Sequence, residues 1–146
     1  DIPLLLSFRK YGAQWDWGAN ADFTWRTGKN DRDYRLGNKG GVGGWFQWKG
    51  FTALSPGMRL HYRWRGRIAG QDAALLVPNP QFPYPAPVTN PSAFGGEQID
   101  LTVFVRFPLA NGWYTEASYA QPLYLDLNGP QSSEKYHFSI EIGTSF

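Results

Sequence analysis

Four arginines and a histidine alternate along one short segment of the chain: Arg59, His61, Arg63, Arg65 and Arg67. Successive side chains of a β-strand point to opposite faces, so these five residues share one face if the segment is a strand. Guanidinium groups this close repel one another unless carboxylates or a bound anion lie between them. Arginine is also well suited to bidentate contacts with carboxylate or phosphate oxygens. The spacing therefore predicts a basic ladder that attracts anions, to which a second predicted strand adds Arg106.

Two further pairs of residues have the types that catalysis or metal binding would need. His137 and Ser139 are two residues apart, but a serine nucleophile needs a base that a third group orients, and no local motif supplies that group. Metal binding through His61 and His137 would require carboxylates to join them from strands that are not adjacent. We therefore expect no catalytic residue, no enzyme activity, no metal site and no cofactor.

The elements that position these residues are predicted to be β-strands, because apolar residues recur with a period of two and nowhere with the helical period. The last segment shows this most clearly, since Tyr136, Phe138, Ile140 and Ile142 alternate with polar residues. Phe104 is an exception, an apolar residue at a polar position of its segment. Seven segments of about ten residues follow the pattern, and they cover residues 4–9, 15–27, 42–49, 58–68, 98–109, 113–125 and 135–146.

Strand length separates two explanations of this alternation. Strands of soluble sandwiches usually have ~5 to 6 residues, whereas a strand that crosses a membrane needs ~9 to 11. The predicted strands have membrane length. Aromatic residues also lie near segment ends, as expected for girdles at the two bilayer interfaces: Trp15, Trp17, Trp25, Trp48, Phe51, Phe107, Trp113 and Phe146. No apolar run approaches the ~20 residues that a membrane helix needs.

We therefore predict an all-β protein, a transmembrane antiparallel up-and-down β-barrel whose apolar faces touch lipid and whose polar faces line a lumen. In the segment 113–125 this assigns Leu123 and Leu125 to the lipid face and Tyr124 to the lumen. His137 and Ser139 face the lumen too. The composition, with 18% charged and 17% aromatic residues, excludes a disordered chain. The absence of cysteine excludes a disulfide framework.

The connections between the predicted strands alternate between short and long, as outer-membrane barrels alternate periplasmic turns with external loops. The longest, residues 70–97, is rich in proline and carries Phe82 and Tyr84 between the prolines. Proline favours extended backbone, so this loop loses little entropy on ordering. Three interpretations are open: an inward constriction, a contact for a partner through Phe82 and Tyr84, or a stiff external loop that shields the barrel mouth.

Seven strands form an incomplete barrel. An amphipathic last strand ending in Phe146 is typical of the signal that outer-membrane proteins present to their insertion machinery, which places the carboxyl end in the periplasm. Counting back seven strands puts the first residue outside, whereas single-chain bacterial barrels have even strand numbers. Open edges in lipid would also leave backbone groups unpaired. Residues 1–146 are therefore predicted to be one partial barrel domain, completed by missing amino-terminal strands or by another chain.

The predicted lumen is basic. Its basic positions number eleven and its acidic positions five, and the basic ones are Arg9, Arg26, Arg35, Lys39, Lys49, Arg59, Arg63, Arg65, Arg67, Arg106 and Lys135. One interpretation is a narrow barrel braced by pairs of arginine with Asp or Glu, and the other is an anion-selective pore lining. Nucleic acid is not expected as a partner, because a ladder sealed inside a barrel cannot meet a duplex.

Several motifs resemble a family of Gram-negative outer-membrane β-barrel transporters of the "meta-pathway of phenol degradation" type. They include Trp15-Asp16-Trp17-Gly18-Ala19, Trp64-Arg65-Gly66-Arg67-Ile68 and Pro122-Leu123-Tyr124-Leu125-Asp126-Leu127-Asn128-Gly129-Pro130-Gln131. The resemblance implies that members are about twice as long and that this chain corresponds to their carboxyl-terminal half. The chain departs from the family in the amount of proline and aromatic residues in its long loop.

The function expected from these features is an outer-membrane channel or transporter-like barrel with a basic, anion-preferring lumen. The alternative is a non-conducting scaffold barrel that forms the membrane part of a larger assembly. Expected partners are the lipid bilayer, the outer-membrane insertion machinery and the strands that close the barrel. A soluble β-sandwich, the third possibility, would purify without detergent.

Overall fold

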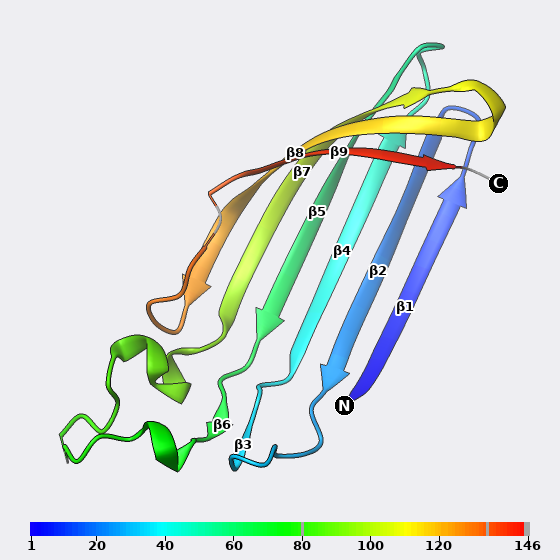
Figure 1. The fold of residues 1–146 in the computed structure, drawn as a ribbon. Coiled ribbons are helices and arrows are strands. Elements are labelled where there is room, and N and C mark those ends of the chain that lie inside the picture. The colour runs from blue at the N-terminus through cyan, green and yellow to red at the C-terminus, as the bar shows by residue number, and fades with distance from the viewer. Residues whose placement is uncertain (80, 134, 145–146) are drawn as a thin grey trace.

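A computed structural model describes residues 1–79, 81–133 and 135–144 of the chain. Over these residues seven strands form one antiparallel sheet in which each strand pairs with its neighbours in the order β1-β2-β4-β5-β7-β8-β9, and Figure 1 shows them side by side. Their bounds are β1 Ile2–Tyr11, β2 Trp15–Trp25, β4 Lys39–Trp48, β5 Ser55–Arg65, β7 Gly96–Pro108, β8 Trp113–Leu127 and β9 His137–Thr144. The predicted number of strands in the sheet is confirmed.

The remaining elements lie in the connections. Two short strands, β3 (Tyr34–Arg35) and β6 (Ala69–Gly70), pair with each other outside the main sheet. Four 3₁₀ turns complete the described elements: η1 Ala73–Leu75, η2 Pro87–Thr89, η3 Pro91–Ala93 and η4 Ala110–Gly112. None of the helical elements in the described part of the chain has the length and apolar character to cross a membrane.

Short and long connections alternate from one end of the sheet to the other, as the sequence predicts. The connections 12–14, 49–54 and 109–112 lie at one end, which we call the turn end. The connection 26–38 and the described residues of the connections 66–95 and 128–136 lie at the other, the loop end. In Figure 1 the amino terminus lies at the loop end, and β9 runs toward the turn end. The two terminal strands therefore run in the same direction, because six antiparallel pairings separate them.

The register keeps most apolar side chains on one face of the sheet, here called the apolar face, and most polar ones on the other, the polar face. Exceptions on the polar face include Leu5, opposite Asp22, and Trp45, opposite Arg59. One row across the apolar face consists of Trp17, Phe46, Met58, Val103, Tyr119 and Phe138. The adjacent row of the polar face consists of Asp16, Gln47, Gly57, Phe104, Ser118 and Ser139.

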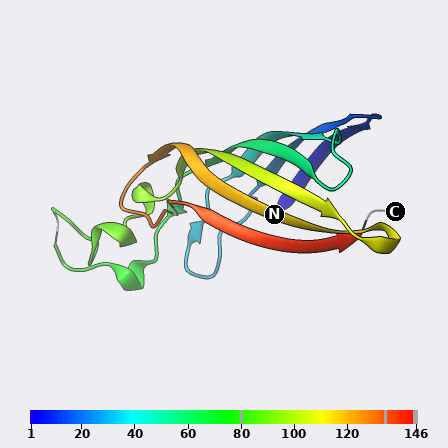
Figure 2. The ribbon, with the colours of Figure 1, turned by 90° about the horizontal axis from the view of Figure 1, so that it is seen from above.

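Burial is reversed relative to a soluble protein. Phe138 is 63% exposed and Ile140 66%, whereas Gln47 is 4% exposed and Glu116 2%. Among the described residues, Phe104 is the one apolar side chain in the buried class, at 3%. Figure 2 shows that the sheet is curved. Side chains on the inner side of a curved sheet crowd and shield one another, so we assign the polar face to the concave side.

Phe104 is buried on the polar face because its neighbours make room for it. Gly57 lies directly opposite it on β5, and a Cβ at Gly57 would come within 2.2 Å of the Phe104 ring. The guanidinium of Arg59 lies over the same ring, 4.0 Å from its centroid. The break in the alternation at Phe104 is therefore a packing site, in which a ring fills the space that a glycine leaves.

Two details of the predicted strands are wrong. A register shift between Ile99 and Asp100 adds one residue to β8, so that Tyr124 lies opposite Ile99 on the apolar face and Leu125 lies opposite Gln98 on the polar face. The sequence predicts Tyr124 on the polar face and Leu125 on the apolar face, because strict alternation cannot include a bulge. The ladder also ends earlier than predicted: β5 ends at Arg65, so Arg67 lies in the connection to β6.

The sheet is open in this structure. β1 and β9 are its two edges and each pairs with one neighbour. The coarse prediction of an antiparallel β-sheet in chain order is confirmed, while closure into a barrel remains a proposal.

Candidate functional site

The polar face of β5 carries the basic ladder, now reduced to Arg59, His61, Arg63 and Arg65. Their register partners on β7 are Thr102, Asp100, Gln98 and Gly96, which places small or polar groups beside each member. The ladder runs along the strand from near the turn end to the loop end. Its members meet different partners, so the structure divides it into parts with different chemistry.

In the part nearest the turn end, two arginines share one buried carboxylate, which reduces their combined charge from +2 to +1. Glu116 accepts hydrogen bonds from Arg59 Nη2 at 2.5 Å and from Arg106 Nη2 at 2.9 Å. Arg106 also stacks over the ring of Tyr114, 4.1 Å from its centroid. Both guanidinium groups are therefore held by charge and by an aromatic ring. Arg59 and Arg106 belong to the bracing arrangement that the sequence left open.

Two more ion pairs lie on the same face. Arg63 Nη2 donates to Asp100 Oδ2 at 2.5 Å, and Gln98 Nε2 donates to the other oxygen of Asp100 at 2.6 Å. Lys49 Nζ lies 2.8 Å from Asp16 Oδ1, which also accepts the backbone N–H of the turn residue Gly12. These contacts connect neighbouring strands and hold the turn between β1 and β2.

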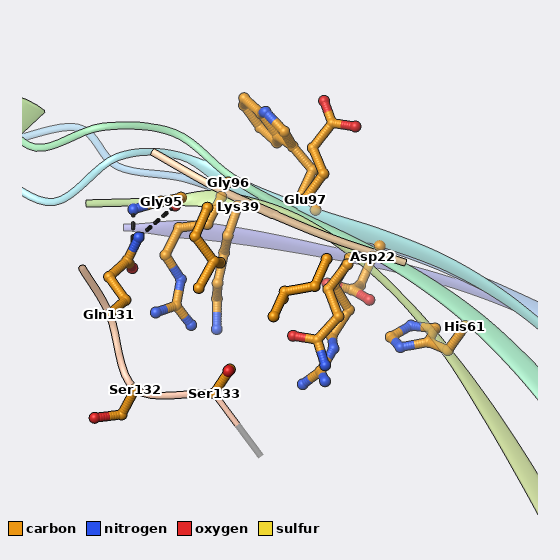
Figure 3. A pocket seen from close by; sticks show the side chains of 17 residues that line it. Asp22, Lys39, His61, Gly95, Gly96, Glu97, Gln131, Ser132 and Ser133 are labelled. Carbon is orange, nitrogen blue, oxygen red and sulfur yellow. Dashed lines mark hydrogen bonds between the residues drawn. The ribbon is translucent and has the colours of Figure 1, made fainter. Parts of the chain in front are cut away.

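The loop-end part of the ladder is different. Lys39 and Arg65 lie directly opposite each other across β4 and β5, and within the described residues neither has a carboxylate within 4.0 Å. They line a recess of about 320 Å³. In Figure 3 the segment 131–133 lies across the recess from Lys39, whereas Glu97 points to the opposite side of the sheet. Lys39 was expected among the lumen residues, but Gln131, Ser132 and Ser133 were not, because strand periodicity says nothing about a connection.

The basic excess of the polar face is smaller than predicted. Three of the predicted basic positions lie outside the main sheet: Arg35 is in β3, and Arg67 and Lys135 are in connections. Arg26 and Lys49 directly follow β2 and β4, and they pair with Asp1 and Asp16. Within the seven strands of the main sheet the polar face carries six basic and five acidic residues, an excess of one where the sequence predicted six for the whole lumen.

His61 and His137 come from strands that β7 and β8 separate, although both line a second recess of about 350 Å³. Within the described ranges no group of three residues of the types that ligate metals is close enough to hold an ion. Ser139 lies on the polar face, where its hydroxyl is 2.7 Å from that of Ser118. Ser118 and Ser139 therefore form a hydroxyl pair between β8 and β9.

The long connection projects away from the sheet. Figures 1 and 2 show residues 71–79 and 81–95 beyond the loop end. The rings of Phe82 and Tyr84 pack edge to face at 5.9 Å, and Tyr84 donates its hydroxyl to Gln71. Neither residue lines the recess, so the structure does not place them as a constriction, and the partner contact stays a prediction. Phe146, the expected insertion signal, lies outside the described residues.

Comparison of the chain with protein-family models, with curated proteins and with solved structures found no match. The class that the fold itself defines is an antiparallel β-meander whose buried side chains, among the described residues, lie on the polar face, while large apolar side chains of the other face are exposed. The resemblance to outer-membrane transporters remains an expectation from sequence motifs.

Proposed function

We propose that the sheet forms part of the wall of a transmembrane β-barrel in a bacterial outer membrane, and that the barrel is a channel or transporter with a basic, anion-preferring lumen. The observation that carries the proposal is the reversed burial of the two faces. Exposing apolar surface to water costs about 25 cal/mol per Å², and large contiguous apolar patches mark contact surfaces. A face that includes Phe138 and Ile140 is stable where acyl chains replace water.

Aromatic contacts at both ends of the apolar face support this environment. At the turn end Trp15 stacks on Phe46 at 4.6 Å and on Trp48 at 5.8 Å. At the loop end Phe23 stacks on Trp64 at 6.5 Å. Trp15 and Trp25 are the end residues of β2, about 33 Å apart at ~3.3 Å per residue. With a tilt of about 40° this gives a height of about 25 Å, which matches the apolar band of outer-membrane barrels.

The two free edges require further strands in this environment. Each backbone group left unpaired in lipid costs several kcal/mol, and β1 and β9 both present an open edge. Because these two strands run in the same direction, an odd number of additional strands completes an antiparallel barrel. Under this proposal they are supplied by another part of a longer chain, as the family resemblance implies, or by a second chain.

A scaffold function is the second candidate, and the buried Glu116 favours it. One carboxylate that bridges Arg59 and Arg106 across the concave face braces the wall, as expected in a barrel that side chains close. Conductance distinguishes the two candidates, because a closed scaffold passes no ions.

The test is selectivity in planar lipid bilayers. We expect the protein to conduct with anions preferred over cations, measured as the reversal potential in a KCl gradient. Lys39→Glu and Arg65→Glu should each shift the preference toward cations, since each reverses a charge without breaking an ion pair of the described residues. Lys29→Glu, in the exposed connection between β2 and β3, is the control for charge reversal outside the sheet, and it breaks only the exposed ion pair with Asp33. A cation-selective wild type contradicts the proposal, absence of conductance favours the scaffold, and purification without detergent contradicts both.

A further inference from the structure

We propose that the recess at the loop end is a binding site for a small carboxylate that carries an apolar body, with Lys39 and Arg65 as the anion-binding pair. The proposal rests on the proposed function, because it takes the polar face to enclose a lumen through which solutes pass. It adds a discrete site and a solute class to that lumen.

The charges explain why an anion is expected here and not elsewhere on the ladder. Arg59 and Arg106 share Glu116, and Arg63 is paired with Asp100. Lys39 and Arg65 face each other across two strands, and like charges directly opposite on a sheet destabilise it. A bound carboxylate between them would replace this repulsion by two attractive contacts, one of them to the planar guanidinium that matches carboxylate geometry.

Asp22 is the carboxylate of the recess that could compete with such a ligand. It lies opposite Gly41, and its Oδ1 and His61 Nε2 are each 3.0 Å from where a Cβ of Gly41 would stand. Asp22 therefore lies over the glycine beside His61, and it forms no ion pair with a described residue. Within residues 1–79, 81–133 and 135–144, no carboxylate pairs with Lys39 or Arg65 on the loop-end side of Asp22.

The opposite wall of the recess is held in place before any ligand binds. Gln131 donates Nε2 to the carbonyl oxygens of Ala93 at 3.0 Å and Gly95 at 2.7 Å, and it accepts the N–H of Gly95 at 3.2 Å. Figure 3 shows these bonds between Gln131 and Gly95 and the position of Ser132 and Ser133 beyond them. The amide thus fixes a segment with two hydroxyl groups across from the basic pair, and a preorganised site loses less entropy on binding.

The bulge in β8 determines the class of ligand. Because it shifts the alternation by one residue, Leu125 and Leu127 lie on the polar face, opposite Gln98 and Gly96, and both line the recess. A basic pair beside two leucines suits a solute with a carboxylate at one end and an apolar body. The volume of about 320 Å³ lies at the lower end for ligand sites, which favours a small molecule.

The experiment measures equilibrium binding to the protein in lipid nanodiscs, with empty nanodiscs as the blank, so it does not depend on conductance. The probes are hexanoate, acetate, which lacks the apolar body, and hexanamide, which lacks the charge. We expect hexanoate to bind at least tenfold more tightly than either. Lys39→Gln and Arg65→Gln should each weaken hexanoate binding about tenfold. Leu127→Ala should weaken hexanoate but leave acetate unchanged.

Arg9→Gln is the matched control, because Arg9 lies on the same polar face near the turn end, away from the recess. It should change the affinity for hexanoate less than twofold. Equal binding of hexanoate and hexanamide overturns the anion site, as does an unchanged affinity in Arg65→Gln. Equal binding of hexanoate and acetate overturns the apolar wall. If binding fails while bilayers still show anion selectivity, the site is wrong and the channel stands; if hexanoate binds but no ions pass, the site stands and the channel is wrong.

Discussion

Glu116→Gln tests the bracing of the wall, because the carboxylate of Glu116 joins two arginines from different strands. The side chain of Glu116 is 3% exposed, while those of Arg59 and Arg106 are 37% and 31% exposed. Breaking a buried ion pair by removing one partner costs about 3–5 kcal/mol. Water reaches both arginines and lowers this cost, so we expect a loss of about 3 kcal/mol in the free energy of unfolding.

The assay is urea unfolding of the protein in lipid vesicles, followed by tryptophan fluorescence. Glu141→Gln is the matched control, since Glu141 lies directly opposite Glu116 on β9 and forms no ion pair with a described residue. Removing the charge of Glu141 relieves its repulsion with Glu116. The free energy of unfolding should therefore stay unchanged or rise by up to about 1 kcal/mol. A loss below about 0.5 kcal/mol for Glu116→Gln, or equal losses for both variants, would refute the bracing by Glu116.

Two further substitutions test the packing of the two faces by the same unfolding assay. Gly57→Ala should destabilise the protein by about 2 kcal/mol, because its Cβ would come within 2.2 Å of the Phe104 ring. Gly44→Ala is the control: its Cβ would have its nearest atom at 3.7 Å, so its effect on stability should be close to zero. Equal effects of the two substitutions would contradict the packing of Phe104 against Gly57. Ile140→Lys places a charge on the lipid side and should lower the free energy of unfolding by about 2 kcal/mol. Glu141→Lys places the same charge on the lumen side, where it does not meet lipid, and should lower that free energy by less than about 0.5 kcal/mol. The reverse order would mean that the faces are exchanged.

The sequence predicted the strands and their faces because one physical pattern, alternation with a period of two, determines both. It predicted that Phe138 and Arg63 lie on opposite faces without any knowledge of pairing. It assigned Tyr124 and Leu125 to the wrong faces because a bulge depends on the partner strand and leaves no mark in a single alternating segment.

The partition of the ladder could not be predicted either. Which arginine meets Glu116 or Asp100 depends on register between strands, and register is set by pairs of residues far apart in the chain. The break in alternation at Phe104 was visible in the sequence. Its cause is the space that Gly57 leaves on the neighbouring strand, which the sequence alone could not show. Gln131 lies in a connection, where its role depends on hydrogen bonds to Ala93 and Gly95.

The central claim is that the apolar face touches acyl chains and the polar face encloses a cavity. The chain has no cysteine, so single spin labels can be introduced by Phe138→Cys, Ser139→Cys, Ile140→Cys and Glu141→Cys in vesicles. The measurement is their collision rate with oxygen, which is enriched in lipid, and with a water-soluble nickel chelate. We expect high oxygen access at 138 and 140 and higher nickel access at 139 and 141. The opposite alternation, or nickel access at all four positions, would contradict the claim.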